Sequence, residues 1–298
     1  MAAITAQPEP IAVSGRAEAD VIREAIGNLT AVATLPQVTT KIISLVENPR
    51  SSAQQLETLV QNDPALVARL LKVVNSSFYG LPGEVSSVER AIVLLGLQAV
   101  KNIAVAASLG QMFRGKDLGG GRSAQDLWTH CIAVAVGSRK LAEATGMCKP
   151  DEAFLCGMVH DIGLLVAAQT FPEGFRHVID EVEATGEPFL DVERRMTGTD
   201  HANLGAALCA KWKFPAACRD VCRFHHKPEL TEDHRGLAAV VYAADTLACE
   251  VAGGFDLTAR RQHLKPQDAK AVYLSADATD ELRAQLPDLV EEAAAILS

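Results

Sequence analysis

Apolar residues recur every three or four positions along most of this 298-residue chain, which is the spacing expected of amphipathic helices. In the first half, the pattern predicts helices that begin near residue 19 and then cover about 36–46, 52–60, 63–74, 86–95 and 98–112. In the second half, it predicts helices over about 124–145, 151–169, 173–185, 200–212, 215–226, 235–251 and 278–297. No strand–helix–strand alternation interrupts the pattern, so the sequence predicts an all-α fold.

Local signals define several helix starts. Asp63 followed by Pro64 is typical of an N-cap and a first helical turn, and Pro36 suits the first turn of another helix. Ser86 and Glu89 have the spacing of a capping box. Residues 1–17 show little apolar periodicity and contain two closely spaced prolines, so we expect a disordered tail there.

The segment GKDLGGGRS, residues 115–123, is the best candidate boundary between two parts of the chain, because it places three glycines in a polar setting. We expect an N-terminal helical lobe over 18–114 and a second lobe over 124–252, with a C-terminal helical extension over 253–298. The linker is short, which favours packing of the lobes against each other. The extension packs on the second lobe or mediates self-association through its apolar positions Leu282, Leu286, Leu289 and Val290.

Composition narrows the functional classes. Hydrophobic residues make up 48% of the chain and aromatic residues only 5%, which favours closely packed helices. A net charge of -9 opposes general nucleic-acid binding and favours a protein or small-molecule partner. We find no signal-peptide pattern and no apolar run long enough for a membrane helix, so we expect a cytoplasmic protein without a membrane anchor. The seven cysteines are an odd set without a CxxC pair, so we expect reduced core thiols.

His160 and Asp161 are the strongest clue to function. They lie next to each other within FLCGMVHDIGLLVAAQ, a segment so apolar that polar side chains in it need partners. Further metal-capable residues occur at wide intervals before and after this pair: His130, His201, His225, His226 and Asp245. Imidazole and carboxylate together suit divalent transition metals such as Zn, Mn, Fe or Ni. Adjacent helical residues point about 100° apart, so His160 and Asp161 can share an ion only where several helices converge.

Each of these residues also has an explanation without metal. His160 and Asp161 could form a hydrogen-bonded pair, and Asp245 could be the ordinary partner of a buried histidine. His201 lies near a predicted helix start, where it could cap the helix or stay solvated, and only one of His225 and His226 need point inward. We assign His177 and His234, which stand outside the pattern, to solvent.

A second arrangement involves cysteine. Cys218, Cys222, His225 and His226 lie at positions i, i+4, i+7 and i+8, which puts all four roughly on one helical face. A separate Cys/His zinc site is conceivable there. We favour the alternative that both cysteines are small core residues, because the spacing is irregular and buried free cysteine is common.

The ordered set of seven residues resembles the ligand order of the HD superfamily of metal-dependent phosphohydrolases, including its dinuclear HD-GYP branch. The segments LPQVTTKIISLVENP, NDPALVARLLKVVNSSFYG and SSVERAIVLLGLQAVKNIAV, with the later TGTDHANLGAALCAKWKFP and FHHKP, resemble the HDOD domain, an HD-related output domain of bacterial signalling proteins. The resemblance covers about residues 28–250, and on it the chain is identified as a member of this family.

The resemblance implies a helical lobe packed on an HD-type lobe, one or two divalent ions with Asp161 able to bridge them, and signal transduction rather than catalysis. The chain departs from the HD-GYP enzymes at two points: Leu164 replaces a usual lysine, and HHKPELTEDHRG carries no GYP motif. Our preferred interpretation is a non-catalytic output or adaptor module that binds a signalling protein or a small nucleotide-like ligand. The alternative is a metal-dependent phosphohydrolase acting on a nucleotide or cyclic dinucleotide, with Lys101 or Lys140 near the groove.

Overall fold

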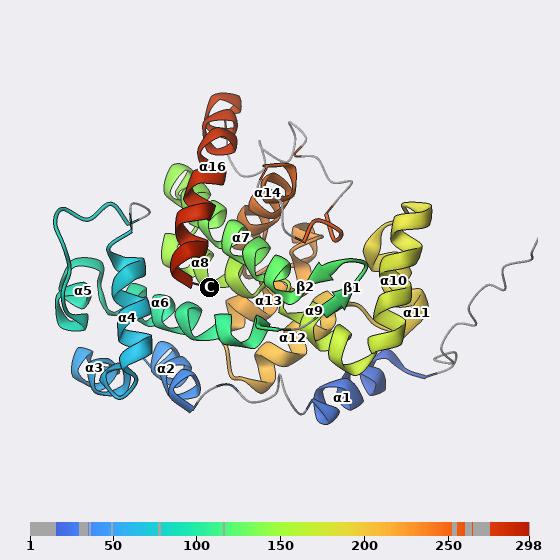
Figure 1. Ribbon diagram of the computed structural model, residues 1–298, viewed down its shortest axis with the longest axis horizontal. Coiled ribbons are helices and arrows are strands. Elements are labelled where there is room, and N and C mark those ends of the chain that lie inside the picture. The colour runs from blue at the N-terminus through green and yellow to red at the C-terminus, as the bar shows by residue number, and fades with distance from the viewer. Residues whose placement is uncertain are drawn as a thin grey trace, which may run out of the picture.

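The computed structural model describes residues 16–29, 35, 37–48, 50–76, 79–115, 117–251, 255–259, 264 and 275–297. Within these ranges the chain forms helices and a single two-stranded hairpin, which confirms the predicted all-α fold (Figure 1). Residues 1–15 of the predicted disordered tail, Pro36, and residues 252–254, 260–263 and 265–274 lie outside the described residues.

The first half of the chain contributes six helices to the described structure. They are α1 (Glu18–Asn28), α2 (Gln37–Glu47), α3 (Ala53–Gln61), α4 (Pro64–Val74), α5 (Val88–Leu95) and α6 (Leu97–Leu109), followed by the 3₁₀ turn η1 (Gly110–Phe113). Helices α2 to α5 gather around α6, which is buried along most of its length (Figure 1). The Asp63 side chain accepts a hydrogen bond from the Leu66 amide at 3.0 Å, and Pro64 opens α4, which confirms that predicted cap.

The second half begins with strands β1 (Asp117–Gly119) and β2 (Arg122–Ser123). Its helices are α7 (Ala124–Thr145), α8 (Pro150–Val159), α9 (Ile162–Thr170), α10 (Pro172–Thr185), α11 (Phe189–Thr197), α12 (His201–Lys211), α13 (Ala216–Phe224), α14 (Arg235–Val251) and α16 (Ala276–Leu297), with the 3₁₀ turn η2 at Pro228–Leu230. Helix α7 is central, since it packs extensively against α8, α14 and α16 (Figure 1).

Two helices connect distant parts of the sequence. Helix α1 lies on α12 and α9, away from α2 and α3 (Figure 1), and Lys211 donates a hydrogen bond to the Ile26 carbonyl at 2.7 Å. Helix α16 packs on both α7 and α4, with Leu282, Leu286 and Val290 buried. The C-terminal extension therefore packs as an additional helix across both halves of the molecule, and the division into lobes at 115–123 stays a prediction.

The glycine-rich segment forms a tight antiparallel hairpin. Gly119, Gly120 and Gly121 have φ values of 91°, 58° and 73°, a region that side chains disfavour. A Cβ on Gly120 would lie 2.5 Å from Cγ2 of Ile179, so the turn also needs glycine to lie close to α10. The glycines therefore fix the hairpin against the second half of the molecule.

The predicted continuous helix over 151–169 is wrong. The chain instead leaves the helix at His160 and Asp161, which separate α8 from α9, and Asp161 has φ -101° and ψ 14°. Apolar residues flank the break on both sides, so the hydrophobic period does not reveal it. Because the break turns the backbone between two buried helices, it places both side chains in the interior where other helices meet.

The predicted capping box at Ser86 and Glu89 is also wrong, since the N-cap of α5 is Ser87, whose hydroxyl accepts a hydrogen bond from the Arg90 amide at 3.1 Å. We expect Ser87→Ala to lower the free energy of unfolding by about 1 kcal/mol, because an amide of the first turn loses its partner. Ser86→Ala is the matched control, since Ser86 is equally exposed and is not the cap. Urea unfolding of both variants measures the effect, and an equal loss in the two would contradict the assignment.

One stretch of the described chain, Pro150–Thr170, is long and apolar enough to cross a membrane. It contains the break between α8 and α9, and 83% of its most apolar window is buried inside the fold. Burial on this scale is what the core of a helical domain produces without any membrane.

Candidate metal centre

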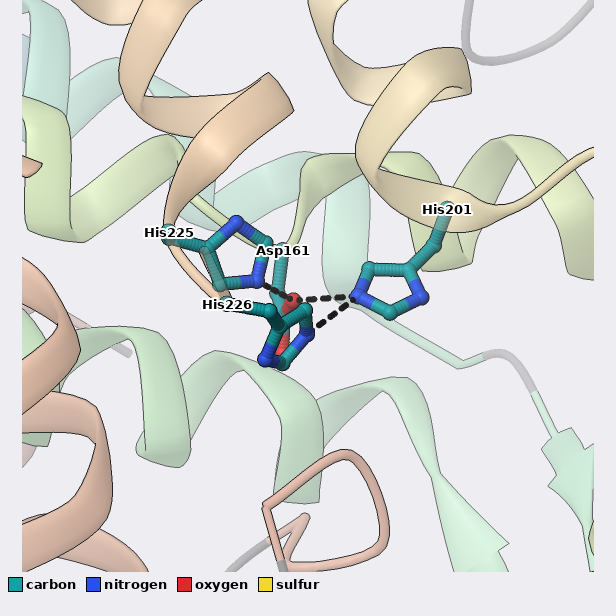
Figure 2. Close-up of side chains that lie close together, drawn as sticks. All are labelled: Asp161, His201, His225 and His226. Atoms are coloured by element: carbon teal, nitrogen blue, oxygen red, sulfur yellow. Dashed lines mark hydrogen bonds and ion pairs between the residues drawn. The ribbon is translucent and has the colours of Figure 1, made fainter. Parts of the chain in front are cut away.

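The structure brings together all seven of the predicted metal-capable residues. His130 comes from α7, His160 and Asp161 from the break between α8 and α9, and Asp245 from α14; His201 opens α12, while His225 and His226 follow α13. Figure 2 shows three of the imidazole rings around the Asp161 carboxylate. Six of the seven residues are fully buried and His226 is half-buried. We call this set the cage.

One half of the cage is formed by His130, His160, Asp245 and one carboxylate oxygen of Asp161. The His130 Nε2 atom lies 3.2 Å from Asp245 Oδ1 and 3.7 Å from Asp161 Oδ2. The His160 Nε2 atom lies 3.3 Å from Asp161 Oδ2 and 3.9 Å from Asp245 Oδ1. Two imidazole nitrogens and two carboxylate oxygens therefore face one point.

The other half uses the second oxygen of Asp161. The Nε2 atoms of His201 and His225 each lie 3.3 Å from Asp161 Oδ1, and His226 Nε2 lies 3.0 Å from His201 Nε2 (Figure 2). Asp161 is thus shared, with one oxygen in each half. Such an arrangement can hold two ions side by side or one ion in either half.

The donor atoms fit a divalent metal ion. With metal–ligand bonds of about 2.1 Å, neighbouring ligand atoms are about 3.0 Å apart in octahedral and about 3.4 Å apart in tetrahedral coordination. Most of the spacings above lie in or near this range. Buried polar atoms without a hydrogen-bond partner also converge here, among them Nε2 of His130, His160 and His225, and Oδ1 of Asp161. Burying such atoms is costly unless something binds them, so a cation suits the cage.

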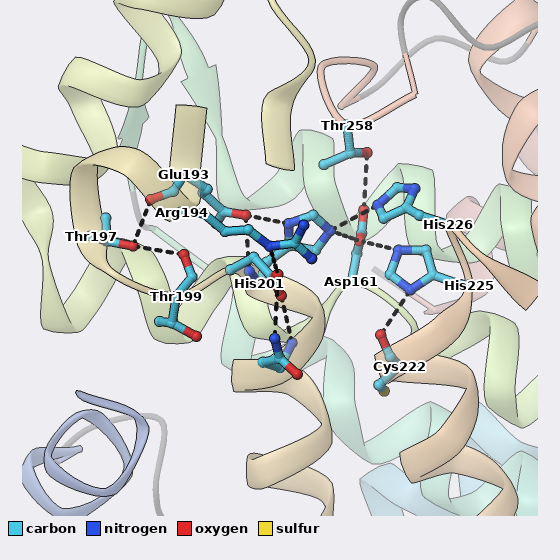
Figure 3. A network of polar contacts seen from close by, with 12 residues as sticks. Asp161, Glu193, Arg194, Thr197, Thr199, His201, Cys222, His225, His226 and Thr258 are labelled. Carbon is cyan, nitrogen blue, oxygen red and sulfur yellow. Dashed lines mark hydrogen bonds and ion pairs between the residues drawn. The ribbon is translucent and has the colours of Figure 1, made fainter. Parts of the chain in front are cut away.

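The protein backbone orients two of the rings. Nδ1 of His160 lies 2.8 Å from the Gly157 carbonyl oxygen, and Nδ1 of His225 lies 2.9 Å from the Cys222 carbonyl oxygen (Figure 3). Because a carbonyl only accepts, each Nδ1 donates, and each Nε2 faces the cage. Metal-binding histidines are commonly held in this way by a hydrogen bond to the other ring nitrogen.

Glu193 orients His201 in the same manner, and sequence reasoning missed it. Its Oε2 atom accepts from His201 Nδ1 at 2.6 Å and from the His201 amide at 2.9 Å, and the side chain is fully buried (Figure 3). Burial raises the pKa of Glu193, partly offset by the attraction of His201. No sequence signal pointed to this role, since Glu193 lies in helix α11, which the apolar pattern did not predict.

We expect Glu193→Ala to weaken metal binding in the half that contains His201 by about 10- to 100-fold, because the ring loses its orienting partner. Glu193→Gln, which keeps an oxygen acceptor, should recover part of that affinity. Competition with a chelator measures the affinity of each variant. Equal metal affinity in wild type and Glu193→Ala would show that His201 is held by packing alone.

Electrostatics favour ionised carboxylates in the cage. Burial opposes ionisation of Asp161, but the neighbouring imidazoles of His160, His201 and His225 outweigh it and hold its pKa well below the usual range. Burial likewise opposes ionisation of Asp245, and the adjacent His130 imidazole outweighs it and lowers the pKa. Two buried negative charges in a ring of imidazoles are therefore a good environment for a divalent cation.

Thr258 is a further contact that sequence reasoning did not identify. Its hydroxyl donates to Asp161 Oδ2 at 3.3 Å (Figure 3), and it belongs to the buried segment Phe255–Ala259, which follows α14. Isolated threonines carry no sequence signal for such a role. The contact places this C-terminal segment directly against the shared carboxylate.

The helical face proposed for Cys218, Cys222, His225 and His226 does not exist as predicted, because α13 ends at Phe224. Cys218 Sγ lies 3.5 Å from Cys156 Sγ, and Cys222 Sγ lies 3.6 Å from Cys209 Sγ, all in the core. Burial raises the pKa of the Cys222 thiol well above its usual value. In the described part of the chain no cysteine joins a metal-capable cluster, so these residues fit the favoured role of small core side chains.

The remaining polar candidates are engaged elsewhere. Lys101 donates to the Leu45 carbonyl at 2.6 Å and to Ser51, and Lys140 pairs with Glu143 at 3.6 Å. Lys140 follows His130 by ten residues on α7, about 15 Å along the helix axis. The expectation that one of these lysines lies at the groove is therefore not met.

The assignment of two histidines to solvent also needs correction. His177 and His234 are both half-buried, and His234 Nδ1 lies 2.7 Å from Asp220 Oδ2. Neither joins the metal-capable groups found in the described residues.

Comparisons with known proteins agree with the fold. The HDOD domain model matches residues 32–228, which leaves Asp245 and Thr258 beyond the match. An uncharacterized protein of Treponema pallidum (strain Nichols) is 26% identical over 216 residues, which cover 71% of this chain but only 41% of that relative.

Solved structures share the architecture. An HDOD domain protein of unknown function from Geobacter sulfurreducens has a TM-score of 0.77 at 22% identity, covering 93% of this chain and 97% of its own. A candidate phosphohydrolase from Shewanella amazonensis SB2B has a TM-score of 0.74 at 24% identity, covering 93% of this chain and 98% of its own. A candidate signal transduction protein from Marinobacter aquaeolei VT8 has a TM-score of 0.74 at 24% identity, covering 94% of this chain and 65% of its own. The family model matches about two thirds of the chain and the helical fold is shared, so the chain belongs to the HDOD domain family.

Proposed function

We propose that this chain is a non-catalytic signal-transduction output or adaptor module, in which the cage holds one or two divalent ions that stabilise the fold. The observation that carries the proposal is the closure of the cage. Six of its seven residues are fully buried, and Thr258 covers the shared carboxylate. Structural metal sites are typically closed by protein ligands, whereas catalytic sites keep a position open to water and substrate.

A bound ion would supply positive charge at the point where α7, α12, α14 and the break between α8 and α9 meet. The chain's own residues hold these elements in register: Asp161 offers one oxygen to each half, and Glu193 and the Gly157 carbonyl fix the rings. Leu164 stands where the HD-GYP enzymes usually have lysine, and it is fully buried. Because leucine is apolar, it offers no charge to a phosphate.

We also propose the class of partner that the module binds. The net charge of -9 supports a signalling protein or a small ligand and disfavours nucleic acid.

One observation favours a second candidate, a metal-dependent phosphohydrolase. Asp161 is placed to bridge two ions, and paired ions about 3.5–4 Å apart are typical of hydrolases that act on phosphate esters. His226, the one half-buried member of the cage, would then mark the side from which a substrate approaches.

Turnover assays separate the two functions. Protein loaded with Mn, Fe, Ni or Mg is incubated with nucleoside triphosphates, cyclic mononucleotides and cyclic dinucleotides, beside Asp161→Ala as the control. The adaptor proposal predicts equal background rates for the two proteins. Metal-dependent hydrolysis by the wild type that disappears in a folded Asp161→Ala variant would establish the phosphohydrolase instead.

A further inference from the structure

A cavity of about 580 Å³ lies between the turn from α10 to α11 and the segment Phe255–Ala259. Its lining runs continuously from Val182 to Leu190 and is completed by Leu257 and Thr258. The last turn of α10 and the first turn of α11 therefore form one side, and the segment after α14 forms the other. The second side lies outside the residues that match the HDOD domain model.

Two residues of this lining also touch the cage. Thr258 donates a hydrogen bond to Asp161 Oδ2 at 3.3 Å, and the Phe189 ring packs edge-on against the His201 ring with centroids 5.8 Å apart. Phe189 and Thr258 thus have the cavity on one side and the two halves of the cage on the other.

The lining is acidic. Glu183 and Glu187 line the cavity, no lysine or arginine is among the described residues that line it, and Asp256 adjoins it. The C-terminal carbonyls of α10 add partial negative charge at the same place. Arginines outside the lining tether these carboxylates: Arg122 contacts Glu183 and Asp256, and Arg195 contacts Glu187. Three carboxylates face two guanidinium groups, so the excess charge of these described residues is negative and favours a cation over an anionic phosphate.

We propose that this cavity is the route by which a hydrated divalent cation enters and leaves the cage, with Thr258 as the gate. The inference rests on the proposed metal-binding function. Six of the seven cage residues are fully buried, so their ion needs a path, and the acidic cavity, which the Thr258 hydroxyl and the Phe189 ring separate from the cage, supplies one. Arg122, which holds Asp256 at 3.3 Å, ties the gate segment to the hairpin and keeps it closed at rest.

The chain provides a matched pair of variants for the acidic lining. Glu187 and Glu181 both contact Arg195, at 3.2 Å and 3.4 Å, but only Glu187 lines the cavity. Metal-stripped protein is mixed with Co²⁺ in a stopped-flow instrument, and uptake is followed by the absorbance of the bound ion. We expect Glu187→Lys to slow uptake about tenfold at low salt and Glu181→Lys to change it less than twofold. The Glu187→Lys effect should shrink in high salt.

If the stripped protein does not fold, exchange of bound zinc with isotopically enriched Zn²⁺, read by mass spectrometry, replaces uptake. A positive charge in the route opposes the cation in both directions, so Glu187→Lys should slow exchange as well. Equal rates for Glu187→Lys and Glu181→Lys, in a protein that does bind metal, would overturn the route and leave the cage intact. Absence of bound metal under all conditions would overturn the proposed function itself.

The gate is tested with Thr258→Ala and Thr258→Ser. We expect Thr258→Ala to accelerate uptake and release of the ion together, by about tenfold, because one hydrogen bond closes the gate. Thr258→Ser, which keeps the hydroxyl, should resemble the wild type. A change in affinity without faster uptake would show that Thr258 only orients Asp161, which would overturn its role as a gate.

Discussion

Asp161→Ala is expected to release nearly all bound divalent metal, with the affinity of both halves of the cage falling about 100-fold or more. Among the described residues, Asp161 alone contributes to both halves, through Oδ2 beside His130 and His160 and Oδ1 beside His201 and His225. Loss of a first ligand costs more than loss of the groups that orient ligands, which typically costs 10- to 100-fold. Elemental analysis and competition with a chelator measure the loss.

The control for this variant is Asp220→Ala, which removes another aspartate that pairs with a histidine, since Asp220 Oδ2 lies 2.7 Å from His234 Nδ1. This pair lies outside the cage, so metal content should not change. Circular dichroism must show that both variants remain helical. A folded Asp161→Ala variant that keeps its metal would refute the shared role of this carboxylate.

Gly163→Ala is expected to lower the free energy of unfolding by about 3 kcal/mol or more. A Cβ at position 163 would lie 1.9 Å from the carbonyl oxygen of His201 and 2.6 Å from the Gly205 amide nitrogen. Both contacts are to backbone, so helices α9 and α12 would have to move apart. Overpacking in a rigid core typically costs 1–3 kcal/mol, and this overlap is severe. Because His201 opens α12, metal affinity should fall with stability.

Gly27→Ala is the matched control, because Gly27 also lies in a helix but its Cβ would meet nothing within 4 Å. That variant should be as stable as the wild type or slightly more stable, since alanine favours helix. Urea unfolding of both proteins, with and without metal, measures the difference. Wild-type stability of Gly163→Ala would contradict the close crossing of α9 and α12.

The residues that gather in the cage could be identified from the sequence because histidine and aspartate are conspicuous in apolar segments. His160 and Asp161 stand out for this reason, and so does Asp245 in α14. The helices around them could be predicted from the apolar period, as the cap at Asp63 shows. Local rules therefore found most of the elements and the seven cage residues.

The features that the sequence did not predict, which are one helix break and two side-chain roles, depend on contacts between distant segments. The break at His160 is invisible to the apolar period because both flanking helices are buried. Glu193 lies in a helix of low apolarity, where a glutamate is ordinarily solvent-exposed, and its role depends on the turn that returns the chain to His201. Thr258 reaches Asp161 from 97 positions away, a contact that no short-range pattern predicts.

The most direct test of the central claim is the metal content of protein purified without chelators, with thermal unfolding recorded before and after treatment with a strong chelator. We predict one to two divalent ions per chain and a clear fall in the unfolding temperature when they are removed, since an ion bound only by the folded cage stabilises that state. A metal-free protein that unfolds at the same temperature with and without added Zn, Mn, Fe or Ni would contradict the account.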